Sequence, residues 1–121
     1  MIHIVGKDAG FRRRLAMRLR ASGYCAQGFP SLVAFARVAC GRRPGCLVID
    51  HHLPNGVDAL SLLERLPAVG ITMPAIVIGS STDDLLPRRA AALGAVAVLK
   101  KPVNEDAVVD AVAQAMMQSA A

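Results

Sequence analysis

Residues 46–54 read CLVIDHHLP, an apolar run that ends in a carboxylate and leads into a polar loop with a proline. The four residues before Asp50 are apolar and do not alternate with polar residues, which is typical of a strand buried on both faces of a sheet. Such strands occur in parallel sheets that helices cover on both sides. The stretch therefore predicts an α/β fold that presents Asp50 at the end of a strand.

Outward from this stretch, apolar runs of the same kind recur, and segments of helical length separate them. A weaker strand is expected at residues 24–27, after Gly23, which can end the preceding helix. The other strands are expected at residues 2–5, 75–78 and 95–99, and the helices at residues 9–21, 31–39, 57–66, 85–93 and 104–118. This alternation predicts one domain over residues 1–121, with a doubly wound, flavodoxin-like (βα)5 parallel sheet in the order 2-1-3-4-5.

In a sheet of this order, ligands bind beyond the carboxyl ends of the strands, where strands one and three lie side by side. Gly6, Lys7 and Asp8 follow the first strand, so they are expected near Asp50. Lys101 follows the last strand, and its ammonium can reach a carboxylate at a neighbouring strand end. These positions are the candidate site.

The order and spacing of these segments resemble the receiver domain of bacterial response regulators along nearly the whole chain. The segments that carry the resemblance are IHIV, GYCAQGF, CLVIDHHLPNGVDAL, MPAIVIGSST and LGAVAVLKKPV. Each piece is common by itself, whereas their combination is specific. The resemblance implies a phosphoacceptor at Asp50, the family's functional lysine at Lys101, a cis peptide bond before Pro102, and a signalling domain of a two-component system rather than an enzyme.

The acidic pair that holds Mg²⁺ in the family is replaced here by Gly6 and Lys7. Asp8 follows one position too late to stand in for either residue. Magnesium prefers carboxylate oxygens, and phosphoryl transfer depends on it to neutralise the transferred oxygens. The sequence therefore predicts no bound metal or other cofactor, and weak or absent Mg²⁺-dependent phosphorylation.

Two positions of the family's conformational switch also differ. The fourth strand ends in Gly79 where the family carries a Ser or Thr, and Ser80 is only an imperfect substitute. On the fifth strand, Val98 stands where the family carries an aromatic residue that turns inward on activation. The switching relay is therefore expected to be dismantled.

Together these features predict an atypical receiver that acts as a protein-interaction module, with a histidine kinase or an output protein as its partner. Lys7 is expected either to form an ion pair with Asp50 in place of the metal or to be a solvated surface lysine. The alternative function is a working receiver that a histidine kinase phosphorylates on Asp50, with Mg²⁺ recovered through Asp8, Asp58 or another ligand.

The last expected helix offers a second kind of contact. One face has apolar residues at helical spacing and should pack on the core; it consists of Val108, Ala111, Val112 and Ala115. Val109, Ala113 and Met117 continue the apolar character beside that face. They predict either additional core packing or a homodimer or partner contact through the fourth and fifth helices.

The formal net charge is +5, and five arginines crowd residues 12–20. Such a segment can attract nucleic acid or an acidic partner. The favoured interpretation is the solvated face of a helix, because aromatic residues make up only 3% of the chain and no nucleic-acid motif accompanies the charge. Nucleic-acid binding is therefore not expected.

The remaining features favour unremarkable roles. The histidines His3, His51 and His52 are not expected to converge on a metal, because the last two are adjacent and point in different directions. The three cysteines form no CxxC pair and are expected to be reduced. No apolar run reaches membrane-spanning length and no secretory signal is evident, so a cytoplasmic location without membrane contact is expected.

Overall fold

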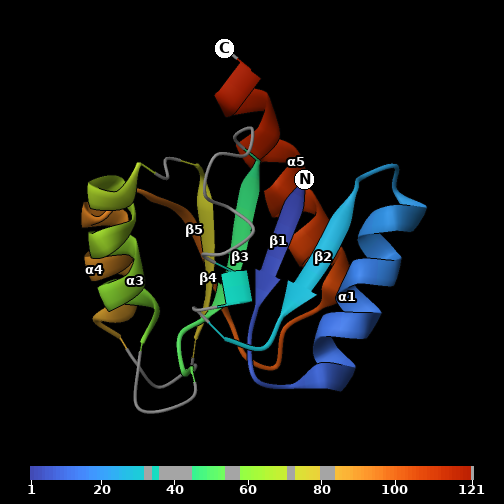
Figure 1. Cartoon of the computed structure of the whole chain (residues 1–121), viewed down its shortest axis with the longest axis horizontal. Helices are drawn as coiled ribbons and strands as arrows, with labels where there is room; N and C mark the ends of the chain where they lie inside the picture. The colour runs from blue at the N-terminus through green and yellow to red at the C-terminus, as the bar shows by residue number, and fades with distance from the viewer. Residues whose placement is uncertain (32–33, 36–44, 54–57, 71–72, 80–83, 121) are drawn as a thin grey trace.

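The computed structural model describes residues 1–31, 34–35, 45–53, 58–70, 73–79 and 84–120. Within them lies a five-stranded parallel sheet in the order β2-β1-β3-β4-β5 (Figure 1). The strands are β1 (Ile2–Val5), β2 (Ala26–Phe29), β3 (Cys46–Asp50), β4 (Ala75–Gly79) and β5 (Ala95–Lys100). The predicted strand order is confirmed.

The helices are α1 (Ala9–Ala21), α3 (Ala59–Arg65), the short 3-10 helix η2 (Leu66–Val69), α4 (Leu86–Ala92) and α5 (Glu105–Ala120). Residues 32–33 and 36–39 of the helix expected at residues 31–39 lie outside the described residues. Among those that are described, the Ser31 hydroxyl accepts the Ala34 N–H at 3.3 Å, as an N-cap would. Residue 57, where the next helix was expected to begin, also lies outside them. None of the helices in the described ranges is long and apolar enough to cross a membrane.

Strand β2 begins two residues later than predicted. The turn that ends α1 extends as far as Tyr24. Gly23 has a φ of 94°, and the Tyr24 N–H still donates to the Leu19 carbonyl, so Tyr24 does not pair with β1. Pairing with β1 then runs from Ala26 opposite Ile2 to Phe29 opposite Val5. The helix-ending turn, rather than the apolar pattern, therefore determines where this edge strand starts.

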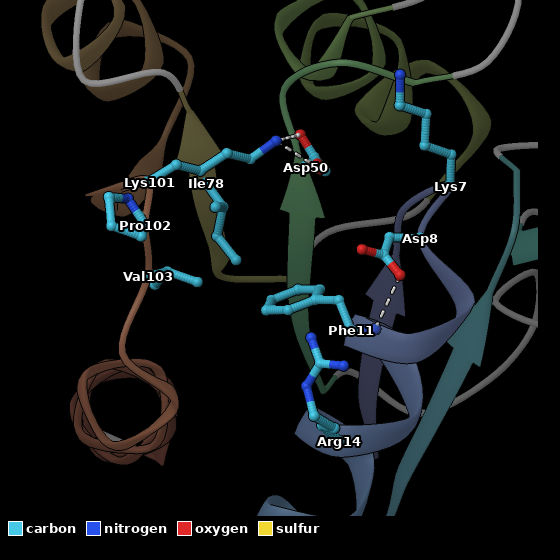
Figure 2. A pocket seen from close by; sticks show the side chains of 9 residues that line it. All are labelled: Lys7, Asp8, Phe11, Arg14, Asp50, Ile78, Lys101, Pro102 and Val103. Atoms are coloured by element: carbon cyan, nitrogen blue, oxygen red, sulfur yellow. Dashed lines mark hydrogen bonds and ion pairs between the residues drawn. The ribbon is translucent and has the colours of Figure 1, made fainter.

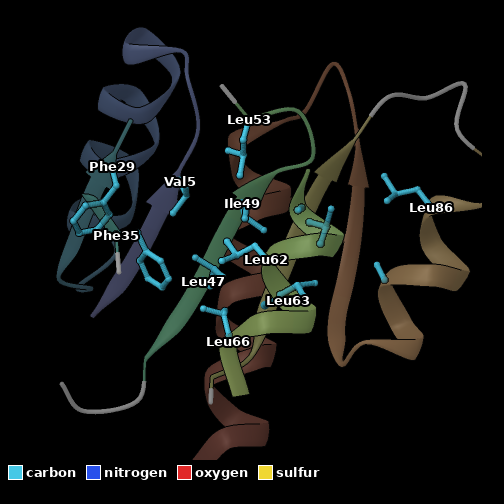
Figure 3. Close-up of a cluster of buried hydrophobic side chains, with 14 residues drawn as sticks. Val5, Phe29, Phe35, Leu47, Ile49, Leu53, Leu62, Leu63, Leu66 and Leu86 are labelled. Atoms are coloured by element: carbon cyan, nitrogen blue, oxygen red, sulfur yellow. The ribbon is translucent and has the colours of Figure 1, made fainter. Parts of the chain in front are cut away.

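Two apolar clusters cover the two faces of the sheet. Side chains of α1 and α5 pack with alternate residues of the central strands, including Ile4, Val48 and Ile76. On the other face, α3 and α4 pack with residues such as Leu47 and Ile49 (Figure 3). Because β3 is buried along its whole length between these layers, its position is fixed and Asp50 is held at the carboxyl edge of the sheet.

Candidate functional site

Asp50 is the last residue of β3, and only 9% of its surface is exposed. One carboxylate oxygen, Oδ1, accepts the backbone N–H of His52 at 3.0 Å. This local hydrogen bond, from the residue two positions further along the chain, orients the carboxylate. A pocket of about 360 Å³ opens beside it, bounded by the starts of α1 and of the segment after β5 (Figure 2).

Lys101 closes one side of this pocket. Its Nζ donates to both oxygens of Asp50, at 3.1 Å to Oδ1 and 3.0 Å to Oδ2. The Lys101–Pro102 peptide bond is cis, and the Lys101 N–H donates to the carbonyl of Gly79 at 2.9 Å. The structure thus brings together the carboxylate and the lysine that the sequence placed at two separate strand ends.

The expected ion pair between Lys7 and Asp50 is not formed. Lys7 is exposed, and Figure 2 draws no ion pair between its side chain and Asp50. It still lines the pocket, directly after β1. Of the two alternatives expected for Lys7, its exposure therefore agrees with the solvated surface lysine. Lys101 already donates to both oxygens of Asp50, so the Lys7 ammonium is not desolvated there.

Asp8 also lines the pocket, but its carboxylate is committed to the start of α1. Oδ1 accepts the N–H of Phe11 at 3.1 Å, which makes Asp8 the N-cap of this helix. That hydrogen bond is the main cause that lowers the pKa of Asp8, with Arg14 and Arg12 acting in the same direction. Asp8 is therefore ionised at neutral pH, with one oxygen occupied by the helix.

Asp58, the other substitute ligand considered from the sequence, is the N-cap of α3. Its Oδ1 accepts the Ser61 N–H at 2.8 Å, and this bond is the main cause of its lowered pKa. His51 adds to the lowering, and Asp58 forms a β-bridge with His52. Asp58 does not line the pocket that contains Asp50.

The residues described here contain no group of three or more His, Cys, Asp or Glu side chains that could hold a metal ion. Position 6 has room for a side chain, since a Cβ on Gly6 would lie 3.5 Å from that of Asp50, an ordinary contact. His3 lies apart from the other two histidines, fully buried with its ring against Phe29 and Phe35. Among the described residues that line the pocket with Asp50, the other carboxylate, an oxygen ligand of the kind that Mg²⁺ prefers, is that of Asp8.

The space next to Gly79 is filled by a side chain that the sequence reasoning missed. A Cβ placed on Gly79 would overlap Cδ2 of Leu86, which is fully buried at the start of α4. Ser80 lies outside the described residues. Val98 is half-buried and packs against the same apolar cluster as Leu86. The only signal for this in the sequence was the glycine at position 79. A glycine at a buried strand end leaves space that a neighbouring side chain must fill.

The predicted core face of α5 is confirmed: Val108, Ala111, Val112 and Ala115 are all buried. Beside it, Val109 is half-buried and packs partly on the core, and Ala113 is also half-buried. Met117 is 73% exposed. Of the three flanking residues, Met117 is therefore the one that leaves most apolar surface in solvent.

The family model described as response regulator receiver domain matches residues 2–113 of this chain. The transcriptional regulatory protein FixJ of Azorhizobium caulinodans is 34% identical over 119 residues, which cover 98% of this chain and 56% of that protein. FixJ of Bradyrhizobium diazoefficiens is 30% identical over 118 residues, with coverages of 98% and 57%. The chain spans about half the length of these curated relatives.

Solved structures show the same architecture. The crystal structure of FixJ-N superimposes with a TM-score of 0.83 at 31% identity and covers 94% of this chain and 90% of its own. A response regulator receiver protein from Pseudoalteromonas atlantica superimposes with a TM-score of 0.84 at 28% identity, covering 98% of both chains. The similarity therefore extends through all the elements that surround Asp50.

Proposed function

Because the chain belongs to the family of response regulator receiver domains, we propose that it is an atypical receiver in two-component signal transduction. It acts mainly as a protein-interaction module and not as an enzyme, and Mg²⁺-dependent phosphorylation of Asp50 is weak or absent. The observation that carries this proposal is the setting of Asp50. Its two oxygens are held by Lys101, while Gly6 and Lys7 follow β1, where the resemblance to the family implies an acidic pair.

The physical reason lies in the difference between an ammonium and a divalent cation. Lys101 compensates the charge of Asp50, but an ammonium cannot coordinate several phosphoryl oxygens in an octahedral arrangement. Asp8 is the other carboxylate among the described lining residues, and its Oδ1 caps α1. The Lys101 ammonium thus balances the negative charge of Asp50, but it does not supply the divalent metal that phosphoryl transfer needs.

The second candidate is a working receiver that a histidine kinase phosphorylates on Asp50. The pairing of Asp50 with Lys101 favours it, since both groups remain in contact at the same edge of the sheet. The second oxygen of Asp8 would then have to contribute to a metal site. The two candidates differ in whether Asp50 accepts a phosphoryl group from a donor in the presence of Mg²⁺.

The deciding experiment incubates the protein with acetyl phosphate and Mg²⁺ and follows its intact mass. We expect little labelling of the unmodified chain, and a clear gain in Mg²⁺ affinity and labelling for Gly6→Asp/Lys7→Asp. The matched control Gly6→Asn/Lys7→Gln alters the same positions without adding carboxylates, and Asp50→Asn identifies the labelled residue. Tight Mg²⁺ binding and efficient labelling of the unmodified chain on Asp50 would establish the working receiver instead.

The contact surface of the module is proposed to lie on α4 and α5. Its apolar members include Val109 and Ala113, and it is continued by Met117, which is largely exposed. A second copy of the chain is the proposed occupant, with an output protein as the other candidate. Solution scattering over a concentration series should detect a dimer that Met117→Glu weakens, whereas Gln114→Glu, on an exposed neighbouring position, should leave it intact.

A further inference from the structure

The arginines of α1 fall into two groups with different surroundings. Arg14 forms an ion pair with Glu105 at 3.4 Å, and Arg18 forms one with Asp106 at 2.8 Å. Both partners belong to the first turn of α5. On this side of the helix, the positive charge is therefore compensated within the domain.

On the other side of α1, the guanidinium groups meet carbonyls instead of carboxylates. Arg12 donates to the Gly6 carbonyl, and Arg20 donates to the Ala26 carbonyl through Nε and Nη2, at 3.2 and 2.7 Å. Arg13 is exposed and has no ion pair with any described residue. A carbonyl orders a guanidinium without neutralising it, so this side keeps its positive charge.

These three arginines line one groove of about 280 Å³ between α1 and the edge strand β2, here called the arginine groove. Its other lining residues are Ala9, Ala16 and Gly28, and no carboxylate is among its described members. Gly28 leaves room for the stem of Arg12, since a Cβ there would lie only 3.1 Å from the Arg12 Cβ. The groove thus combines small residues with three guanidinium groups.

We propose that the arginine groove binds an acidic segment of a partner protein. Guanidinium groups bind carboxylates through paired, charge-assisted hydrogen bonds. The backbone carbonyls already restrict the side chains of Arg12 and Arg20, so less conformational entropy is lost on binding. This site lies on α1 and β2 rather than at Asp50, so the proposal does not depend on whether Asp50 is phosphorylated.

The spacing of the arginines indicates the kind of segment that fits. Arg12 and Arg20 are eight positions apart on α1, which is about 12 Å along a helix axis. An extended peptide advances about 3.3 Å per residue. Acidic side chains about four residues apart in an extended segment can therefore reach both ends of the groove, with Arg13 available to a third carboxylate.

A nucleic-acid duplex fits this surface less well. Duplex binding depends on a row of cations that face successive phosphates. Arg14 and Arg18 are neutralised by α5, and Asp110 is exposed on the same helix. A phosphate backbone that followed α1 would therefore approach the α5 carboxylates of Glu105, Asp106 and Asp110. A short acidic peptide, by contrast, can stay within the arginine groove.

The test measures binding of a fluorescent hexaglutamate peptide to the complete chain at low ionic strength. We expect saturable binding that weakens with added salt. Arg13→Gln/Arg20→Gln should lower the affinity by at least about tenfold, since charge-assisted contacts are lost. The matched control Arg14→Gln/Arg18→Gln removes the same charge from the same helix and should change the affinity by no more than about threefold.

The single variant Arg13→Glu tests the arginine groove in a protein that is expected to fold normally, because Arg13 is exposed and makes no described hydrogen bond or ion pair. It should weaken peptide binding while circular dichroism stays unchanged. Equal losses in the two double variants would reduce the effect to net charge and overturn the proposal. So would a lack of salt-sensitive binding, or tighter binding of a short DNA duplex that depends on the same groove arginines.

Discussion

Leu86 occupies the space next to Gly79 in which a side chain at position 79 would lie. The two residues come from different elements, since Gly79 ends β4 and Leu86 begins α4. Leu86 is fully buried and belongs to the apolar cluster on that face of the sheet. A Ser or Thr at position 79 therefore requires the Leu86 side chain to leave its present position.

Gly79→Thr is predicted to lower the free energy of unfolding by about 1–3 kcal/mol, the usual cost of overpacking a core. Chemical denaturation with urea measures it. Gly6→Ala is the control, because a Cβ at this position, directly after β1, meets the Asp50 Cβ at an ordinary 3.5 Å. It should change stability by less than about 0.5 kcal/mol.

The same pair predicts a coupling between the two positions. Leu86→Ala alone should cost about 2–5 kcal/mol, because it empties a buried site. Combined with Gly79→Thr, the loss should be smaller than the sum, since the threonine then occupies the vacated space. Additive losses in this double-mutant cycle would mean that Leu86 does not exclude a side chain at position 79.

The ion pair between Asp50 and Lys101 is predicted to contribute more than a surface pair. The Asp50 side chain is 12% exposed and that of Lys101 43%, compared with 68% for Asp106 and 41% for Arg18. A double-mutant cycle of Asp50→Asn and Lys101→Met should give a coupling free energy of about 1 kcal/mol in the free energy of unfolding, and added salt should reduce it. The control cycle Asp106→Asn and Arg18→Met should give about 0.3 kcal/mol; equal couplings would contradict the prediction.

Asp58 is predicted to make stability depend on acidic pH. Because hydrogen bonding lowers the pKa of Asp58 from its ordinary value of 3.8, the cap is fully stabilising above that value and is lost as the pH falls through the lower folded pKa. Asp58→Asn keeps a cap but should remove this part of the pH dependence of unfolding. Asp58→Ala should cost about 1 kcal/mol at neutral pH; an unchanged acid profile in Asp58→Asn would exclude Asp58 as its source.

Two cysteines are predicted to differ in reactivity. Burial raises the pKa of Cys46 to about 12, so almost no thiolate forms at pH values near 8. Cys25 is exposed. Iodoacetamide at mildly alkaline pH should therefore modify Cys25 in the folded protein and Cys46 only in denaturant, as peptide mass spectrometry can resolve. Rapid modification of native Cys46 would show that β3 opens far more readily than its burial indicates.

The sequence by itself determined the architecture of this chain. Continuous apolar runs can be accommodated only in strands covered on both faces, so the pattern around residues 46–49 already indicated a parallel sheet between helices. Chain order then placed Asp50 and Lys101 at one edge of that sheet, because parallel strands end on the same side. Both conclusions follow from local periodicity and connectivity, which a single sequence contains.

Tertiary structure alone decided how the side chains at this edge share their partners. Topology placed both Lys7 and Lys101 within reach of Asp50. Only the packed geometry shows that Lys101 donates to both oxygens while Lys7 is exposed to solvent. In the same way, nothing local to Gly79 indicates that Leu86 fills its space. Such choices depend on distances between elements far apart in the chain, and side-chain packing and desolvation settle them only after the sheet and its helices have come together.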